Sequence, residues 1–151
     1  RFAAVGRALT NEPGATVVLT GAAGDKAMVD QVRRAIGDRP IIDTAGALDL
    51  PGTAALLARL DVLVTGDTGP MHLAAAVGTP VVALFGPSDP KRYGPLATKQ
   101  RVLRVQLPCS PCGQVRLPPE RCRGHVPDCM DGITVDAVVR AARELMAESA
   151  R

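Results

Sequence analysis

Short runs of apolar, often β-branched residues alternate along this chain with longer segments whose apolar residues recur at helical spacing. Such runs are typical of buried parallel strands, and the segments between them are typical of amphipathic helices. The pattern predicts strands over 16–20, 41–42, 61–65, 79–85 and 101–105. Because strand and helix alternate, we expect an α/β fold: an open, parallel, Rossmann-like sheet with helices on both faces.

The helices are defined by apolar stripes and by residues that favour helix ends. An amphipathic helix is predicted over 26–36, and Thr53 is expected to cap another over 54–60. Thr134 is the expected cap of the last helix. The buried stripe of that helix is expected to comprise Val135, Val138, Val139, Ala142, Leu145 and Met146.

The chain opens inside an apolar helical stripe formed by Phe2, Val5 and Leu9, with no capping residue before it. We therefore expect Arg1 to lie part-way along a longer protein. Near the other end, residues 107–132 are dense in Pro, Cys and Gly and lack a periodic pattern, which predicts an ordered loop within the same domain.

The stretch from 61 to 95 organises the predicted fold. Its first apolar run is broken by Gly66-Asp67-Thr68-Gly69, and Pro70 then suits the first position of a short helix. A second buried run ends at Gly86-Pro87. Because parallel strands bring their carboxyl ends to one edge of the sheet, both loops are expected at the edge where α/β sheets bind ligands.

A helix N-terminus offers backbone N–H groups and a partial positive charge, which together favour a bound diphosphate. Gly69 lets the backbone come close to such a ligand, and the Thr68 hydroxyl suits either a phosphate contact or a helix cap. His72 falls in the first helical turn. Taken alone, the tetrapeptide 66–69 is more typical of a simple capped turn than of a ligand site.

Composition and the absence of certain motifs exclude several classes of function. The 151 residues carry a mild formal charge of +3, and the aromatic residues are only Phe2, Phe85 and Tyr93, so a nucleic-acid partner is not expected. No apolar run is long enough to span a membrane. The sequence around Lys26 lacks the spacing of a P-loop, and neither a dinucleotide fingerprint nor a D-x-D pair occurs. We expect no required cofactor.

The central motifs also carry a family resemblance. Their spacing resembles the donor-side signature of the family 9 glycosyltransferases, the bacterial ADP-heptose:lipopolysaccharide heptosyltransferases. The residues that carry it are Asp67-Thr68-Gly69-Pro70-Met71-His72, Ala74-Ala75-Ala76, Gly78-Thr79-Pro80 and Phe85-Gly86-Pro87-Ser88-Asp89-Pro90. With this signature we prefer the ligand-binding interpretation of the 66–69 tetrapeptide to the simple turn.

The resemblance implies a donor site for an ADP-activated heptose. Its residues would be Asp67, Thr68, Gly69, Pro70, Met71 and His72, together with Gly21, Asp25 and Leu48. Asp25 would hold ribose hydroxyls, with a helix cap as the equal alternative, and Leu48 would contact the adenine. His72 would stabilise the leaving diphosphate.

The resemblance further implies the C-terminal half of a GT-B enzyme. The whole of 1–151 would then be a donor domain without its first strand, and the lipid-linked saccharide acceptor and catalytic base would belong to a missing N-terminal domain. This chain would itself carry no catalytic base and would be inactive alone. The expected location is the cytoplasm, and within it the surface of the inner membrane is a possible site of peripheral attachment.

Four cysteines, Cys109, Cys112, Cys122 and Cys129, are spaced C-x2-C-x9-C-x6-C. Four thiols in a short loop can hold a structural zinc ion, and free or mutually bridged thiols are the alternative. The rival to a transferase is accordingly a non-catalytic, Rossmann-like interaction module with a zinc-stapled loop.

Overall fold

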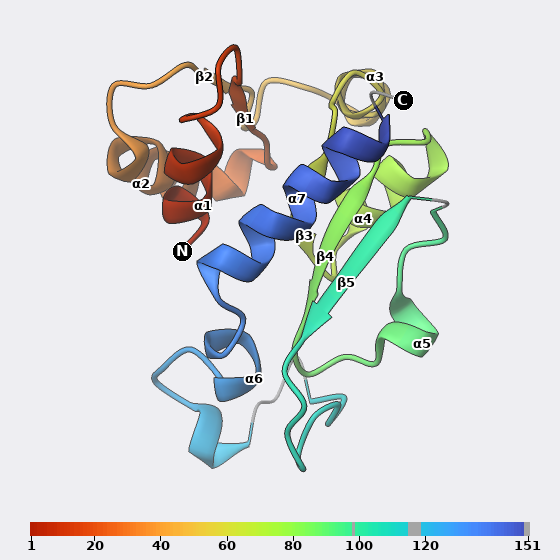
Figure 1. Cartoon of the computed structure of the whole chain (residues 1–151). Coiled ribbons are helices and arrows are strands. Elements are labelled where there is room, and N and C mark those ends of the chain that lie inside the picture. The colour runs from red at the N-terminus through yellow and green to blue at the C-terminus, as the bar shows by residue number, and fades with distance from the viewer. Residues whose placement is uncertain (98, 115–118, 150–151) are drawn as a thin grey trace. The chain divides into compact units, whose positions relative to one another are not determined.

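The computed structural model describes residues 1–97, 99–114 and 119–149 (Figure 1). They form two compact units, one over 1–55 and the other over 56–151. Both units are built from parallel strands joined through helices, so the predicted α/β class is confirmed. The strands form two parallel sheets in the described residues, with the orders β1-β2 and β3-β4-β5.

The N-terminal unit contains the shorter sheet. Strands β1 (Val17–Leu19) and β2 (Ile41–Asp43) pair in parallel, with Val17 opposite Ile41. The connection runs through a 3-10 turn at Ala23–Asp25 and helix α2 (Lys26–Ile36). Helix α1 (Phe2–Leu9) packs on α2, and a Cβ placed on Gly6 would lie 2.8 Å from the Cδ1 of Ile36.

Helix α3 (Leu50–Leu57) begins earlier than the sequence predicts. The expected cap, Thr53, lies inside the helix, and the Asp49 side chain accepts a hydrogen bond of 2.8 Å from the backbone N–H of Gly52 instead. Asp49 also accepts, through its backbone carbonyl, from the N–H of Thr53. The prediction of Thr53 as the cap was therefore wrong, because an Asp four residues earlier reaches the first helical N–H groups.

The C-terminal unit is organised around β4 (Val81–Phe85), which pairs in parallel with β3 (Leu63–Gly66) and β5 (Gln100–Arg104). Helix α4 (Gly69–Ala76) crosses from β3 to β4. Helix α5 (Pro90–Tyr93), which was not predicted from the sequence, precedes β5. The long helix α7 (Val135–Ser149) contacts all three strands and is drawn in front of them in Figure 1.

Both faces of this sheet are covered. Side chains alternate between the faces of a strand, and the fully buried Val81, Ala83 and Phe85 share one core cluster with Met71 and Ala74 of α4. Val82, between them, is also fully buried and must face the other side. Four residues of the predicted apolar stripe of α7 are buried: Val138, Val139, Ala142 and Leu145. The other two, Val135 and Met146, are partly buried.

The start of α7 has the cap that the sequence predicts. The hydroxyl of Thr134 accepts a hydrogen bond of 3.2 Å from the backbone N–H of Ala137, as expected of an N-cap. The predicted loop over 107–132 contains two short turns, a 3-10 turn at Glu120–Cys122 and helix α6 (Asp128–Asp131). Residues 115–118 of this loop lie outside the described residues.

One buried polar contact ties α3 to the start of β4. The hydroxyl of Thr79, which is 3% exposed, donates a hydrogen bond of 2.7 Å to the backbone carbonyl of Leu57. The same carbonyl also accepts from the N–H of Leu60. Loss of the hydroxyl would therefore remove one hydrogen bond without leaving the carbonyl unpaired.

We predict that Thr79→Val lowers the free energy of unfolding by about 1 kcal/mol, the net value of one hydrogen bond. Urea unfolding of the two proteins measures the difference. Thr53→Val is the matched control, because no hydrogen bond of the Thr53 side chain is found in the described residues. Equal losses in the two variants would contradict a special role for Thr79.

Candidate functional site

The loop between β3 and α4 is exposed at the carboxyl edge of the larger sheet. Asp67, Thr68, Gly69, Pro70 and His72 are all exposed, whereas the strand before them and the helix after them are anchored in the core. Helix α4 begins at Gly69, so Pro70 occupies the second helical position and not the first position that the sequence predicted. The polar side chains of the predicted signature therefore face solvent, where a ligand can reach them.

Thr68 occupies the N-cap position but does not act as a side-chain cap. Its backbone is extended, at φ −146° and ψ 164°, and its hydroxyl makes no hydrogen bond to the helix. Instead the Thr68 hydroxyl lies 3.0 Å from that of Thr65 and 3.4 Å from the Gly66 carbonyl oxygen. Of the two roles left open by the sequence, the structure removes side-chain capping and leaves a ligand contact as a prediction.

Asp67 and His72 make no hydrogen bond or ion pair within the part of the chain that the structure describes. Exposed charged side chains without a partner are common on protein surfaces, but these two lie at a strand-end loop, where binding residues are often found. Both lie within a few residues of the helix N-terminus, whose partial positive charge favours anions. The arrangement suits a ligand with both an anionic group and hydroxyl groups.

Met71 differs from its neighbours in the signature. Its side chain is fully buried in the cluster that contains Leu57, Leu63 and Phe85. Its backbone N–H donates a hydrogen bond of 3.1 Å to the Thr68 carbonyl. Met71 thus anchors α4, and its side chain is not available to a ligand in this structure.

The predicted residues of the N-terminal unit lie on loops that follow its strands. Gly21 follows β1, and its carbonyl accepts from the N–H of Gly46. Asp25 is exposed and one of its oxygens, Oδ2, accepts a hydrogen bond of 2.9 Å from the Ala22 N–H. It makes no side-chain cap to α2. The predicted cap therefore exists, but on the 3-10 turn, and it leaves the other carboxylate oxygen available.

Leu48 precedes α3 and is 40% exposed, which leaves part of its apolar surface open to contact. The predicted site residues are divided between the two units, which are described separately. The N-terminal unit contains Gly21, Asp25 and Leu48, and the C-terminal unit contains residues 67–72.

Asp43, at the end of β2, was not predicted from the sequence as a functional residue. One oxygen of this carboxylate accepts a hydrogen bond of 3.0 Å from the Ala45 N–H, and the other lies 3.6 Å from the Lys26 ammonium. The hydrogen bond from Ala45 is the main cause that lowers the pKa of Asp43, partial burial opposes it, and Lys26 adds to the lowering. A polar residue directly after a short apolar run was the available signal.

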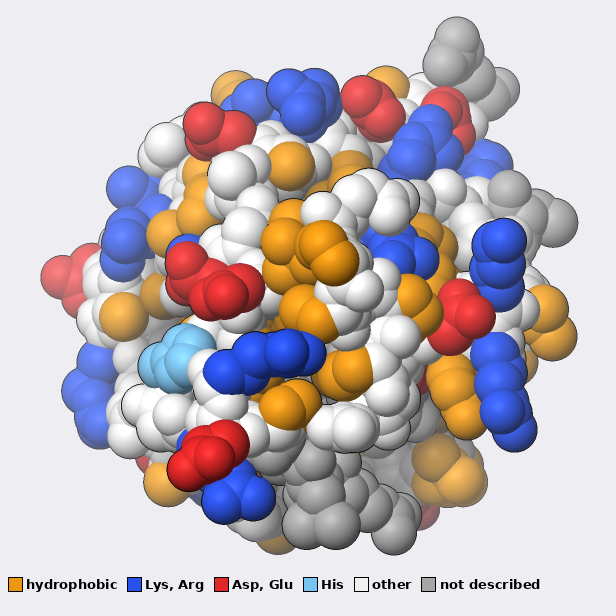
Figure 2. Space-filling model, turned by 90° about the horizontal axis from the view of Figure 1, so that it is seen from below, with side chains coloured by type: hydrophobic (Ala, Val, Ile, Leu, Met, Phe, Trp, Pro, Cys, Tyr) orange, Lys and Arg blue, Asp and Glu red, His pale blue; other side chains and the backbone are white. Residues whose placement is uncertain are grey.

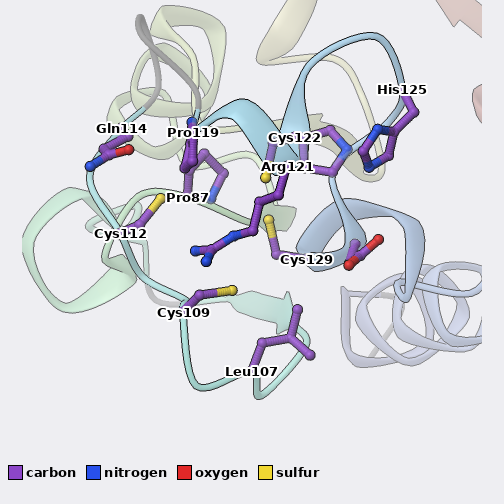
Figure 3. Close-up of a pocket in the computed structure, with 12 residues that line it drawn as sticks. Pro87, Leu107, Cys109, Cys112, Gln114, Pro119, Arg121, Cys122, His125 and Cys129 are labelled. Atoms are coloured by element: carbon purple, nitrogen blue, oxygen red, sulfur yellow. The ribbon is translucent and has the colours of Figure 1, made fainter.

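The four cysteines all line one cavity of about 290 Å³ in the C-terminal unit (Figure 3). Cys109 and Cys112 are exposed, Cys122 is intermediate and Cys129 is buried. Burial raises the pKa of the Cys129 thiol, and the charges of the other three cysteines raise it further. Among the described residues, no three His, Cys, Asp or Glu side chains stand in metal-binding geometry.

The surface carries no single charged field on the face shown in Figure 2. Lys, Arg, Asp and Glu side chains are interspersed there with hydrophobic ones, as far as the described residues show. This mixture agrees with the mild net charge of +3. No helix of the described chain is long and apolar enough to cross a membrane.

Comparison with known proteins defines the class. The sequence model of glycosyltransferase family 9 (heptosyltransferase) matches residues 1–120. This match covers well over half of the chain, and strands β1 to β5, helices α1 to α5 and residues 66–72 fall within it. The chain therefore belongs to glycosyltransferase family 9.

Individual relatives agree with this assignment. Lipopolysaccharide heptosyltransferase 2 of Salmonella typhimurium is 37% identical over 107 residues, which are 69% of this chain and 30% of the relative. Lipooligosaccharide heptosyltransferase 2 of Haemophilus influenzae is 35% identical over 95 residues, 61% of this chain and 28% of the relative. The chain thus spans less than a third of the length of these curated relatives.

Solved structures show the same fold. The E. coli ADP-heptose lps heptosyltransferase II superposes with a TM-score of 0.83 at 29% identity, over 99% of this chain and 41% of that one. A family 9 glycosyl transferase from Veillonella parvula gives 0.81 at 31% identity, over 97% and 40%. Membership of a transferase family favours an enzyme over the non-catalytic interaction module considered above.

The ion pair at Asp43 gives a pH prediction. Because its folded pKa lies below the ordinary value of 3.8, ionised Asp43 stabilises the fold above pH about 4, and this stabilisation is lost as the pH falls through the lower folded pKa. Lys26→Met should raise the Asp43 pKa only part of the way, since the Ala45 hydrogen bond remains. NMR titration of the carboxyl carbon measures it, with Lys91→Met as control. An Asp43 that titrates at or above its ordinary value in the unsubstituted protein would contradict this account.

Proposed function

We propose that this chain binds the nucleoside diphosphate part of an ADP-activated heptose, as the donor half of an enzyme that transfers heptose to a lipopolysaccharide core or a similar saccharide. The observation that carries the proposal is the start of α4, where Asp67 and His72 are exposed and make no hydrogen bond or ion pair within the described residues. Family membership and the relatives' names support heptose transfer. The enzyme would work in the cytoplasm, at the membrane surface where a lipid-linked acceptor is found.

The chemistry follows from the place of this loop. A sugar-nucleotide donor reacts by expelling its diphosphate, and negative charge therefore grows on the phosphate oxygens in the transition state. The backbone N–H of Gly69, at the start of α4, and the Thr68 hydroxyl would donate to that charge, and His72 would add a charge-assisted donor. Groups fixed in place before the reaction stabilise the transition state without a cost of rearrangement.

Asp67 requires a different role, because a carboxylate beside a diphosphate is repulsive. We propose that it accepts hydrogen bonds from hydroxyl groups of the sugar. Thr65 would assist Thr68, since the contact of 3.0 Å between their hydroxyls restricts the rotation of the Thr68 side chain.

For the N-terminal unit we propose roles that rest on its own geometry. The carboxylate oxygen of Asp25 that does not bond to Ala22 would accept from a ribose hydroxyl. The exposed part of Leu48 would contact the adenine, and Gly21 would let the backbone approach the nucleotide. The acceptor and the catalytic base are proposed to belong to a part of the enzyme outside these 151 residues. The chain by itself should then bind ADP weakly and transfer no sugar.

The first test separates a glycine needed by the fold from one needed by a ligand. A Cβ placed on Gly69 would meet no atom within 4 Å, and its φ is not positive. We predict that Gly69→Ala leaves the melting temperature unchanged or slightly higher but weakens ADP binding at least about 10-fold, a cost of about 1.4 kcal/mol. Calorimetric titration with ADP measures it.

The matched control is Gly78→Ala. Gly78 also has open space around it, but its φ is +85°, so the substitution should lower stability and leave ADP affinity intact. If Gly69→Ala binds ADP as well as the unsubstituted chain does, the helix start is not the diphosphate site.

The second test concerns His72 in the full-length enzyme. A charge-assisted hydrogen bond contributes roughly 1.5–3 kcal/mol, and one that strengthens as the diphosphate leaves should appear mainly in kcat. We predict that His72→Ala lowers kcat about 10- to 100-fold, with the melting temperature unchanged because the side chain is exposed. Steady-state kinetics with an ADP-heptose donor measure the loss.

The neighbouring variant Ala76→Ser, on the exposed part of the same helix, is the control and should keep full activity. A His72→Ala enzyme with normal kcat and normal donor affinity would remove His72 from the site.

A further inference from the structure

Two loops of the N-terminal unit follow its two strands, one over 20–25 after β1 and the other over 44–48 after β2. Asp25 lies on the first loop and Leu48 on the second, and these are the residues for which we propose contacts with the ribose and the adenine. Because β1 and β2 are parallel neighbours, both loops leave the same edge of the sheet. Their relative placement therefore decides whether one nucleoside can reach both residues.

Backbone contacts fasten the second loop to the first. The N–H of Gly46 donates a hydrogen bond of 2.9 Å to the Gly21 carbonyl, and the N–H of Thr44 donates one of 2.9 Å to the Leu19 carbonyl. The Thr44 hydroxyl reaches the same Leu19 oxygen at 3.1 Å. A Cβ placed on Gly46 would lie only 3.0 Å from the Cα of Ala23, so the two loops are in close contact at this point.

Asp43 keeps the second loop in the conformation that makes these contacts. Its Oδ1 accepts a hydrogen bond of 3.0 Å from the N–H of Ala45, and its Oδ2 lies 3.6 Å from the Lys26 ammonium. Ala45 is only 5% exposed, so its N–H, left without Asp43, would have to turn toward water to regain a partner. That turn would move Thr44 and Gly46, the two residues through which the loops are joined.

The same loop holds Leu48 in place. The N–H groups of four consecutive residues, 44 to 47, are all hydrogen-bonded within the unit. A Cβ placed on Gly52 would lie 3.5 Å from both the Cβ and the Cδ2 of Leu48, so this side chain packs on the backbone of the first turn of α3. A loop bonded in this way is expected to keep its shape before a ligand binds.

Building on the function proposed above, we infer that Asp43 is a positioning residue of the donor site. By accepting from the Ala45 N–H, it fixes the 44–48 loop, and with it Leu48, against the loop that carries Asp25. Asp43 acts through this loop and not by touching the nucleotide. The surface for the nucleoside is then formed before the donor arrives, and binding requires no ordering of the loop.

This role predicts a particular kinetic signature. The nucleoside part of a sugar-nucleotide is remote from the bond that breaks, so contacts with it are equally strong in the ground state and in the transition state. Loss of such contacts raises KM and leaves kcat unchanged. Asp43 should therefore differ from His72, whose loss is expected to lower kcat.

The experiment uses the full-length enzyme and steady-state kinetics with an ADP-heptose donor. We predict that Asp43→Ala raises the donor KM about 5- to 10-fold, with kcat changed less than about two-fold. Inhibition by ADP should weaken by the same factor as the KM rises, because ADP keeps the nucleoside. Inorganic pyrophosphate, which lacks the nucleoside, should inhibit the variant and the unsubstituted enzyme equally.

Two control variants separate positioning from general stability. In Asp43→Asn the amide oxygen can still accept from the Ala45 N–H, although the exposed ion pair to Lys26 is lost, so the KM should stay within about two-fold of normal. In Thr10→Val the hydrogen bond of 2.9 Å from the hydroxyl to the Gly6 carbonyl is lost, in the same unit but on neither loop. Thr10→Val should lower the melting temperature and leave the donor KM unchanged.

A second measurement does not depend on the folding of a variant. In the unsubstituted enzyme without ligand, the N–H groups of Ala45 and Gly46 should already be protected from hydrogen exchange, which NMR can follow. Free exchange of both groups without ADP, with protection gained only in its presence, would show that the ligand orders the loop and would overturn the inference.

The kinetic outcomes distinguish the role of Asp43 from the function on which it rests. If the unsubstituted enzyme neither binds ADP nor uses an ADP-heptose donor, the proposed function fails and this role fails with it. An enzyme that binds ADP but whose Asp43→Ala variant keeps the normal donor KM overturns the role of Asp43 alone. The same conclusion follows if Asp43→Ala weakens inhibition by pyrophosphate as much as by ADP, or if Asp43→Asn is as impaired as Asp43→Ala.

Discussion

The parallel pairing of β4 with strands on both sides is the constraint from which the C-terminal unit follows. Gly66, the last residue of β3, pairs with Leu84, one residue before the end of β4. The chain therefore leaves both strands at the same level, and the loops at 67–68 and 86–89 share one edge of the sheet. The loop that we propose to bind a diphosphate, and the contact of the 107–132 loop with Gly86, both follow from this register.

The same core sets the orientation of the side chains offered to a ligand. Met71 is fully buried against β4, which fixes the rotation of α4 about its axis. His72 is the next residue, about 100° further round the helix, and it is exposed as a result. A residue that belongs to the family signature can therefore be essential without touching the ligand. Met71 would act by holding its neighbours in place.

Much of this arrangement could be predicted from the sequence, because it depends on apolar periodicity and on glycine and proline at strand ends. The strands, α2, α7 and the exposed 66–72 loop were predicted in this way. Features that depend on particular side-chain contacts were not predicted. Asp49 displaced Thr53 as the cap of α3, and Asp43 gained its backbone and Lys26 partners only through folding. The contacts of Asp49 with Gly52 and of Asp43 with Ala45 are local, but several polar residues near each position could have made them. The contact with Lys26 joins two separate segments, and no local pattern specifies it.

Glycines show how fold and function can be separated residue by residue. Gly86 is explained by packing, since a Cβ there would collide with the sulfur atoms of Cys129 and Met130. Gly78 is explained by its backbone, at φ +85°. Neither packing nor a positive φ explains the glycine at position 69. A Cβ there would meet open space, and helix formation itself would favour alanine. Gly24 shares the open space and the absence of a positive φ, so an open glycine alone does not identify a site. The position of Gly69 at the N-terminus of α4, beside Asp67 and His72, supports the proposal that an anionic ligand approaches the backbone there.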